Sequence, residues 1–378
     1  MMYFDHAATS WPKPPEVLAA MQACLERAGG NPGRSGHRAA VEAHRTLREA
    51  RRKVAGLLGG VDPDRVVFTL NGTDALNLAI KGAVRPGDHV VYTAADHNSV
   101  HRPVHALMLR GVITSTCVDV DGDGVVDPDE VRCAITGRTR LVALPHASNV
   151  TGVIQPARDV IRAVHEHDAL VLLDAAQTAG VLDLKVGEIS ADLVAFPGHK
   201  ALRGPTGTGI LYVGPRADLQ PLREGGTGGE SDSPLQPEAL PTRMEAGTPN
   251  TVGIAGLSAA LDVVRPETAL AHERALLRRL VSRLEEVRGI RVLGPADVER
   301  RVGVLSLTIE GVDPQDAAAI LDESFDLAVR AGLHCAPNLH RALGTYPSGT
   351  LRVSFGVSNT EAEVDALAEA LKQIAAQT

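Results

Sequence analysis

The chain has 378 residues, of which 44% are hydrophobic, and its formal net charge is −8. This length is sufficient for one large domain and a smaller one. Acidic and basic residues are interspersed, so a basic surface for nucleic acid is not expected. No apolar stretch approaches the roughly 18 residues of a membrane span. Residues 1–6 also lack a basic segment followed by an apolar region, so we expect a soluble, cytoplasmic protein without a membrane partner.

Short apolar strands alternate with helices over the first 260 residues. Strands are predicted at residues 66–69, 89–92, 111–118, 141–144, 171–174, 192–195 and 209–213. Helices are predicted at residues 16–27, 39–58, 157–167 and 252–263, and from about residues 72 and 97. This alternation indicates a mostly parallel sheet covered by helices on both faces, with ligands at the carboxyl ends of its strands. The Gly-rich residues 29–37 and 225–234 are predicted to be loops, and the second could close over a site or contact another subunit.

The last third of the chain has a different pattern. Strands are predicted at residues 290–293, 302–309, 328–330 and 351–355, and helices at residues 267–286, 313–321 and 360–375. This order indicates a smaller α+β domain. We therefore expect three parts: residues 1–15, a segment associated with the small domain; residues 16–260, the large domain; and residues 261–378, the small domain.

Two residues at predicted strand ends indicate a cofactor. Lys200 follows a buried strand on a turn bounded by glycines, where a partly desolvated amine can be neutral and can condense with a carbonyl group. Asp174 ends another apolar strand. Pyridoxal phosphate needs a lysine for its aldehyde and a carboxylate for its pyridinium nitrogen, and this pair supplies both. For Lys200 taken alone, an ordinary surface lysine is the alternative.

Further polar residues follow neighbouring strands. Gly72-Thr73-Asp74 opens a helix, where N–H groups and the helix dipole favour an anion, although Thr and Asp are also ordinary caps. His97 could stack on a planar cofactor and relay protons, or it could be one more satisfied histidine among 14. Gln177 could donate to the cofactor's phenolic oxygen or cap a helix.

The C-terminal part contains a candidate nucleophile. Cys335 stands in a loop bounded by Gly and Pro, with Arg330 and His334 nearby in sequence. Positive charge lowers the pKa of a thiol from about 8.5 toward neutrality and increases its thiolate fraction. Arg352 lies in an apolar strand, where it either forms a structural salt bridge or binds a substrate carboxylate. The other cysteines fit no disulfide or zinc pattern and are expected to be reduced and structural: Cys24, Cys117 and Cys133.

One segment indicates a different class of protein. The segment from Asp119 to Glu130 matches the acidic positions, the glycine and the final glutamate of an EF-hand calcium loop. An EF-hand needs a helix on each side, whereas residues 111–118 are β-branched and Pro128 is typical of the start of a following helix. We interpret the segment as a turn between a strand and a helix and assign no metal site. A calcium-binding module is the distant alternative.

Taken together, these motifs resemble the pyridoxal phosphate enzymes of fold type I in the class V aminotransferase family. Within it, the chain is similar to the cysteine desulfurases of the SufS and selenocysteine lyase type. The resemblance covers essentially the whole chain, and its most specific segments are residues 174–177, 198–200 with 204–207, 245–250 and 330–336. It implies a large α/β domain with a mostly parallel seven-stranded sheet and a smaller α+β C-terminal domain.

The resemblance also assigns roles to single residues. It implies that Lys200 forms the Schiff base with pyridoxal 5'-phosphate, Asp174 pairs with the ring nitrogen, and Gln177 bonds the phenolic oxygen. His97 stacks on the ring and Asn149 supports it. The remaining cofactor-binding residues are Thr73, Asp74, His199 and Thr248, the last reaching the partner's cofactor across a homodimer interface. The implied substrate-binding residues are Arg352, Asn149, Arg330, His37 and Ala8.

Two positions depart from the family pattern. The family usually has Ser or Thr where this chain has Pro197, which offers neither a hydroxyl nor an N–H group. Asp74 stands where the SufS type commonly has a second threonine, so only its backbone could serve an anion. Phosphate binding should therefore depend more on Thr73, His199 and Thr248.

The reaction that the resemblance implies converts L-cysteine to L-alanine. Lys200 would move the Cα proton, His97 would relay protons, and Cys335 would take the sulfur as a persulfide. A thiol or a sulfur-acceptor protein would then receive it, in sulfur metabolism such as iron–sulfur cluster assembly. Selenocysteine lyase is the nearest alternative. The other is a β-lyase, epimerase or transaminase of the same family in which Cys335 is not catalytic.

Overall fold

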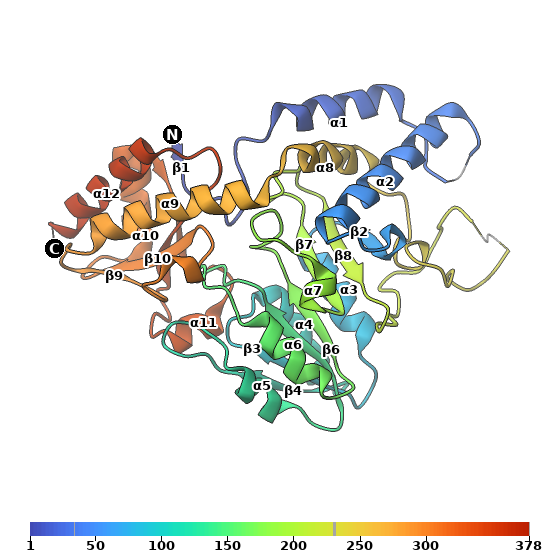
Figure 1. Cartoon of the computed structure of the whole chain (residues 1–378), viewed down its shortest axis with the longest axis horizontal. Coiled ribbons are helices and arrows are strands. Elements are labelled where there is room, and N and C mark those ends of the chain that lie inside the picture. The colour runs from blue at the N-terminus through green and yellow to red at the C-terminus, as the bar shows by residue number, and fades with distance from the viewer. Residues whose placement is uncertain (34, 230–231, 378) are drawn as a thin grey trace.

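The computed structural model describes residues 1–33, 35–229 and 232–377, so part of the predicted loop at residues 225–234 lies outside the described residues (Figure 1). A seven-stranded sheet occupies the centre of the chain. Its strands are β2 (Val66–Thr69), β3 (His89–Thr93), β4 (Thr114–Val118), β5 (Thr139–Pro145), β6 (Leu170–Asp174), β7 (Leu193–Pro197) and β8 (Gly209–Val213). In the order β2-β8-β7-β6-β5-β3-β4, β8 runs antiparallel to both neighbours and the other pairs run parallel. The predicted mostly parallel sheet is confirmed.

Helices cover both faces of this sheet, because its strands are apolar on both sides. In β6, Leu170 and Leu172 point to one core, whereas Val171 and Leu173 point to the other. The first core includes α3 (Gly72–Ala83) and α4 (Asn98–Leu109). The second includes α2 (Arg38–Leu57), α5 (Pro128–Ala134), α6 (Ala157–His165), α7 (Val186–Ile189) and α8 (Thr251–Val263). Helix α1 (Pro15–Arg27) packs outside this layer, against α8.

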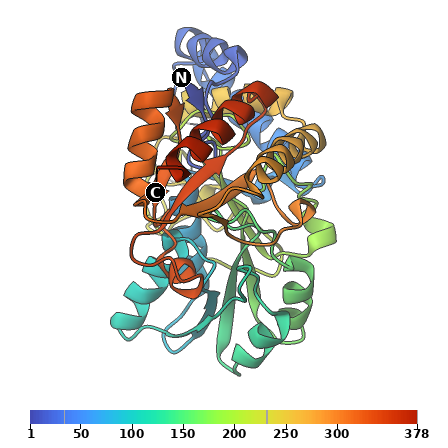
Figure 2. The ribbon, with the colours of Figure 1, turned by 90° about the vertical axis from the view of Figure 1, so that its left-hand side faces the viewer.

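The C-terminal part forms a second, antiparallel sheet with the strand order β12-β13-β10-β9. Its strands are β9 (Ile290–Val292), β10 (Val304–Ile309), β12 (Arg330–Gly332) and β13 (Thr350–Ser354). Helices α9 (Pro266–Leu284), α10 (Pro314–Phe325) and α12 (Glu361–Ala375) share one apolar core with this sheet and lie side by side over it in Figure 2. The predicted α+β arrangement is therefore confirmed.

Short elements complete the fold. Strand β1 (Met2–Tyr3) pairs in parallel with β11 (Leu327–Ala328), so the N-terminal segment packs on the C-terminal part. Helix α11 (Pro337–Ala342) follows the loop that contains Cys335. In the part of the chain that the structure describes, three short 3₁₀ helices lie at Pro63–Arg65, Thr242–Met244 and Val298–Arg300.

The register of β13 directs polar side chains toward the large sheet. Leu351 and Val353 belong to the apolar core under the C-terminal helices. Arg352 and Ser354 alternate with them and therefore face the other way. Arg352 donates to the carbonyl of Asn149, and Ser354 accepts from the N–H of Ala7. A site between the two sheets is the consequence.

The acidic segment that resembles an EF-hand loop lies between β4 and α5. The side chain of Asp121 accepts hydrogen bonds from the N–H groups of Asp123 and Val125, as in an ordinary polar turn. Because a strand and not a helix precedes the segment, it is not an EF-hand, and the strand–turn–helix interpretation is confirmed.

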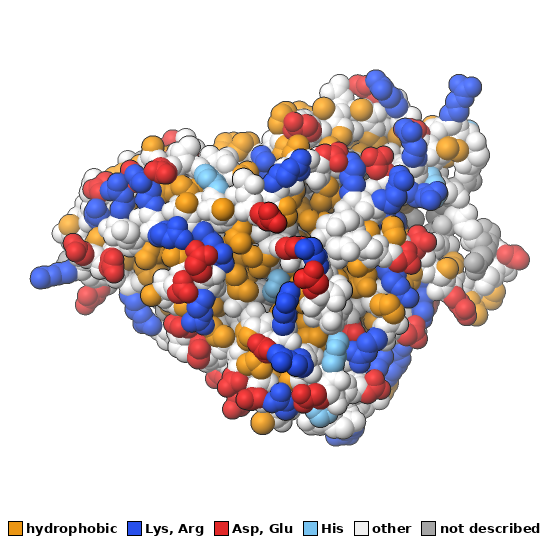
Figure 3. All heavy atoms as spheres, in the orientation of Figure 1, with side chains coloured by type: hydrophobic (Ala, Val, Ile, Leu, Met, Phe, Trp, Pro, Cys, Tyr) orange, Lys and Arg blue, Asp and Glu red, His pale blue; other side chains and the backbone are white. Residues whose placement is uncertain are grey.

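The surface carries both signs of charge. Acidic and basic side chains are interspersed over the face shown in Figure 3. Within residues 1–33, 35–229 and 232–377, every helix is too short or too polar to cross a lipid bilayer.

Candidate active site

A cavity of about 220 Å³ lies at the carboxyl ends of the parallel strands, with residues of both sheets in its walls. Such strand ends are the usual ligand site of an open α/β sheet. Ten residues that the sequence analysis singled out line this cavity together: Ala8, Thr73, His97, Asn149, Asp174, Gln177, His199, Lys200, Arg330 and Arg352.

Lys200 follows β7 on a tight turn. The N–H of Gly198 donates to the carbonyl of Thr208, and the N–H of Gly204 donates back to Gly198. A Cβ atom at position 198 would stand 2.3 Å from the hydroxyl oxygen of Thr208, so this position needs glycine. Burial lowers the pKa of Lys200 from 10.5 to about 8, against the opposing effect of Asp174. A substantial fraction of the amine is therefore neutral near pH 8.

Asp174 ends β6, beside β7, and is only 6% exposed. Its Oδ1 accepts from the N–H of Ala176 at 2.9 Å, whereas its other oxygen has no hydrogen bond within the described residues. Burial raises the pKa of this carboxyl group, and the positive charge of Lys200 lowers it. A cationic N–H group at the free oxygen would satisfy it and favour the carboxylate form.

The first turn of α3 is an anion-binding end. Asn71 caps the helix by accepting from the N–H of Asp74 at 2.9 Å. The N–H groups of Gly72 and Thr73 have no hydrogen bond within the described residues and lie at the positive end of the helix dipole. Pro197 packs closely here, because its ring would stand 3.2 Å from a Cβ atom at Gly72.

Asp74 does not belong to the cavity wall. Its side chain accepts from the N–H of Leu70 and pairs with Arg223, and its own N–H is used by Asn71. Neither its carboxylate nor its backbone donor is thus available to an anion in the cavity.

Ser99 is a site residue that the sequence analysis did not assign. Its hydroxyl lies 2.8 Å from the hydroxyl of Thr73 and 2.8 Å from Nδ1 of His97. Nδ1 of His97 also accepts from the N–H of Ser99 at 3.0 Å, which places the ring proton on Nε2. Burial and the charge of Lys200 lower the pKa of His97 to about 4, so the ring is neutral. The position of Ser99, two residues after a histidine that caps a helix, was the available signal.

The N-terminal segment holds two further cavity residues in place. His199 Nδ1 lies 3.1 Å from the hydroxyl of Thr9, and its carbonyl accepts from the amine of Lys13 at 2.7 Å. Burial lowers the pKa of His199 to about 4. The side-chain amide of Gln177 donates to the carbonyl of Ala7 at 3.1 Å. The N-terminal segment therefore contributes Ala7 and Ala8 to the cavity wall, although it is distant in sequence from the strands of the large sheet.

Arg352 is the most deeply buried cation of the cavity, at 1% exposed. It pairs with Asp5 at 2.7 Å and donates to the carbonyl of Asn149 at 2.9 Å, while its buried Nε has no partner within the described residues. Arg330 is its direct neighbour across the β12–β13 pair. Two guanidinium groups with one carboxylate leave a net positive charge and a free donor, which suit a carboxylate ligand. The structural salt bridge and the capacity for a ligand therefore occur together.

The loop of Cys335 is strained and firmly tethered. His334 and Cys335 both have left-handed backbone conformations, with φ of 47° and 59°. Asn149 donates to the carbonyl of His334 at 2.6 Å, and the N–H of Asn98 donates to the carbonyl of Cys335 at 2.7 Å. Cys335 lies on the wall of an outer groove that shares Arg330 and His334 with the inner cavity.

The expectation that His334 carries positive charge beside Cys335 is wrong. Burial and the charge of Arg352 lower the pKa of His334 to about 2, so the ring is neutral. Its Nε2 faces the carbonyl of Thr350 at 3.1 Å. The position of His334 next to Cys335 in sequence could not reveal that its ring is neutral, because the burial of the ring comes from the fold.

Two of the candidate binding residues lie away from this cavity. His37 caps α2 and accepts from the N–H of Ala40. Thr248 accepts from the amide of Asn31 at 3.3 Å, on the wall of a separate cavity of about 650 Å³ that residues 227–229 also line. Neither residue lines the inner cavity of its own chain.

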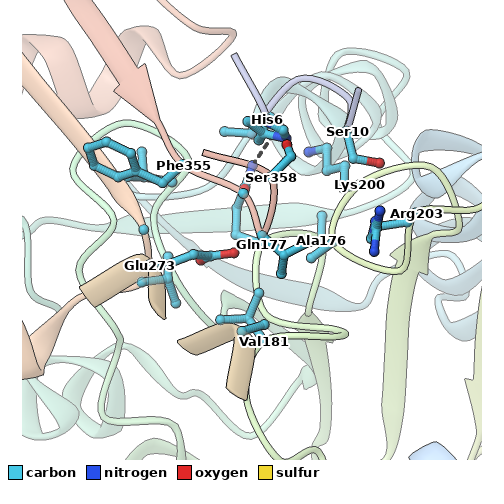
Figure 4. A pocket seen from close by; sticks show the side chains of 18 of the residues that line it. His6, Ser10, Ala176, Gln177, Val181, Lys200, Arg203, Glu273, Phe355 and Ser358 are labelled. Atoms are coloured by element: carbon cyan, nitrogen blue, oxygen red, sulfur yellow. Dashed lines mark hydrogen bonds between the residues drawn. The ribbon is translucent and has the colours of Figure 1, made fainter. Parts of the chain in front are cut away.

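A smaller cavity of about 40 Å³ adjoins the inner cavity and shares Gln177 and Lys200 with it (Figure 4). Glu273 points its carboxyl group into this space. Burial raises the pKa of Glu273 to about 8. His6 faces the same cavity and its buried Nε2 has no partner within the described residues.

The architecture and the lysine–aspartate pair define fold type I of the pyridoxal phosphate enzymes. Solved structures agree: the apo cysteine desulfurase from Thermococcus onnurineus superposes with a TM-score of 0.93 at 31% identity, over 100% of this chain and 95% of that one. The cysteine desulfurase CsdA from Escherichia coli has a TM-score of 0.87 at 31% identity, over 98% of this chain and 94% of that one.

The family follows from the sequence comparisons. The family model described as Aminotransferase class-V matches residues 2–367, and the chain belongs to this family. A relative from Methanothermobacter thermautotrophicus, described as a probable cysteine desulfurase, is 37% identical over 99% of this chain and 94% of its own length.

Proposed function

We propose that the protein is a pyridoxal phosphate-dependent cysteine desulfurase, which converts L-cysteine to L-alanine and transfers the sulfur to Cys335. The observation that carries the proposal is the arrangement of one inner cavity with Lys200 and Asp174, and one outer groove with Cys335, joined through Arg330 and His334. The relatives named cysteine desulfurase support it.

The cavity residues fit this cofactor. Lys200 would hold its aldehyde, and the free oxygen of Asp174 would accept from its ring nitrogen. Its phosphate would lie at the unpaired N–H groups of α3, with Thr73 and His199 beside it. When bound, pyridoxal phosphate supplies an electron sink for bonds at Cα of an amino acid.

The substrate carboxylate would bind the free Nε of Arg352, with Arg330 adding charge. The neutral amine of Lys200 would then accept the Cα proton, for which its lowered pKa suits it. His97, with its proton on Nε2, would pass protons within the site.

The sulfur step uses Cys335. Its thiolate attacks the substrate sulfur, an S–S bond forms, and the substrate C–S bond breaks. The released carbon takes a proton and becomes the methyl group of alanine. Atoms balance, since L-cysteine and the thiol of Cys335 give L-alanine and a persulfide, with no other oxidant or reductant.

A homodimer would complete the site. Thr248 lies on a surface away from its own cavity, which agrees with a contact to the partner's cofactor phosphate. We further propose a division near residue 260, where α9 enters the core of the C-terminal sheet. A cytoplasmic location is also part of this proposal.

The test is to incubate the holoprotein with L-cysteine and a reducing thiol, and to measure alanine and sulfide. Cys335→Ala should lose most of both products, whereas Cys133→Ala, a matched change at an exposed cysteine, should not. Activity unaffected by Cys335→Ala would contradict the proposal and favour a β-lyase, epimerase or transaminase. Higher turnover with L-selenocysteine than with L-cysteine would favour a selenocysteine lyase.

A further inference from the structure

The outer groove of Cys335 is open to solvent and has a volume of about 830 Å³. Its walls come from α4, α10, α11 and the two segments at residues 330–337 and 347–348. Cys335 lies on this wall, so a thiol that enters the groove can reach its sulfur.

The groove is cationic. Three arginines line it, Arg102, Arg330 and Arg341, and no Asp or Glu is among its described lining residues. Within the described residues these three arginines form no ion pair with a carboxylate. Most ion pairs of the described residues, in contrast, are formed by other arginines. In a chain with a net charge of −8, this groove is a local exception.

One titratable neighbour, His101, responds to this charge. The pKa of His101 is lowered by burial, by His105, and by the charges of Arg341 and Arg102. The rings of His101 and His105 are stacked at 6.0 Å between centroids. A concave site with walls of one charge raises the local concentration of the opposite charge.

The rim suits a protein more than a small molecule. Leu109 is 73% exposed and lines the groove, and Tyr346, 48% exposed, lies under the guanidinium of Arg341 at 4.3 Å. Exposed apolar side chains beside arginine and tyrosine are typical of protein interfaces. A small carboxylate thiol would leave Leu109 and Tyr346 uncovered.

We propose that this groove docks an acidic loop of a protein that carries the accepting thiol. The inference rests on the proposed function. The acceptor thiolate attacks the outer sulfur of the Cys335 persulfide, a new S–S bond forms, and the thiolate of Cys335 leaves, so electrons and atoms balance. Charge on the acceptor, and not only thiol reactivity, then determines the transfer rate.

The experiment uses three synthetic 12-residue peptides with one central cysteine, flanked by Glu, Gln or Lys. The holoprotein is first loaded with one equivalent of ³⁵S-labelled L-cysteine, alanine is quantified, and transfer of label to each peptide is followed. Each transfer rate is divided by the rate at which the same peptide reacts with a small disulfide. This ratio removes differences in thiol reactivity between the peptides. Fluorescently labelled peptides with Ser in place of Cys report binding without any sulfur transfer.

The acidic peptide should receive sulfur at least about tenfold faster than the neutral one at low salt, and added salt should reduce the difference. Arg102→Glu and Arg341→Glu should each lower this rate and weaken binding several-fold, while Arg341→Lys retains both. Arg291→Glu is the matched control, an exposed arginine on β9 outside the groove. Alanine formed during loading should be the same in all four variants.

Equal rates for the three peptides, or equal effects of Arg102→Glu and Arg291→Glu, would overturn the inference. The inference would also be overturned if mercaptosuccinate, a small dianionic thiol, received sulfur as fast as the acidic peptide. Absence of alanine in the loading step would instead refute the proposed function, and binding of the serine peptides would still test the groove.

Discussion

Lys200 should destabilise the protein when no cofactor holds its amine. A pKa lowered from 10.5 to about 8 corresponds to about 3 kcal/mol, at about 1.4 kcal/mol for each pKa unit. This is an upper value, because the side chain keeps partial contact with the cavity. Lys200→Met removes the charge and retains the apolar stem, so the apoprotein of this variant should be more stable than wild type at pH 7.

The pH dependence follows from the direction of the shift. Between pH 8 and 10.5 the unfolded chain keeps the proton that the folded chain has lost, so wild-type stability rises with pH in this window. The advantage of Lys200→Met should therefore decline from up to about 3 kcal/mol at pH 7 to below about 1 kcal/mol at pH 10.

Urea unfolding of both apoproteins at pH 7 and pH 10 measures this difference. Lys81→Met, at an exposed position of α3, is the control and should show no such change between the two pH values. A variant that is less stable than wild type at pH 7, or equally advantaged at both pH values, would refute the reasoning.

Three other changes have definite expected results. Ser99→Ala removes the hydroxyl between Thr73 and His97, and should raise the cofactor dissociation constant by about 5- to 30-fold. Titration of the apoprotein with cofactor measures this constant, and an unchanged value would contradict the assignment of Ser99 to the cofactor site. Arg352→Lys keeps the charge but loses the planar donors, and should raise KM for L-cysteine by about 10- to 100-fold with a smaller change in kcat; an unchanged KM would exclude the carboxylate role. Burial raises the pKa of Glu273 from 4.5 to about 8, so between these pH values the folded chain keeps a proton that the unfolded chain has released, and wild-type stability falls as pH rises. Glu273→Gln should therefore become progressively more stable than wild type over that range in thermal unfolding. A constant difference would count against a buried, titrating carboxyl group.

The sequence predicts the elements that its own pattern determines. Strand β6 is an unbroken apolar run, and the polar residue at its end is where the cavity begins. Strand β1 and helix α11 are missing from the prediction because they are short and owe their structure to contacts. Met2, for example, is held by the carbonyl of Asp326, far away in the chain. No local pattern encodes such a pair.

The same division applies to the site. Lys200, Asp174 and His97 were predictable because each follows a strand of a parallel sheet, and such ends converge. The Asp5–Arg352 pair joins residues 347 positions apart, and only the fold shows that it leaves Nε free. The neutral ring of His334 was missed for a related reason, since its pKa is lowered by burial and by the charge of Arg352, and only the fold brings both about.

One residue connects the two halves of the proposed reaction. Asn149 accepts from Arg352 through its carbonyl and donates to the carbonyl of His334 through its amide, next to Cys335. A carboxylate that binds Arg352 therefore contacts the hydrogen-bond partner of Asn149, and Asn149 is the residue that holds the strained Cys335 loop. We infer that substrate binding and the position of the thiol are coupled through these hydrogen bonds. Loss of the Asn149 amide should accordingly impair sulfur transfer more than removal of the Cα proton. Sulfur transfer depends on the position of the Cys335 loop, whereas removal of the Cα proton depends on Lys200.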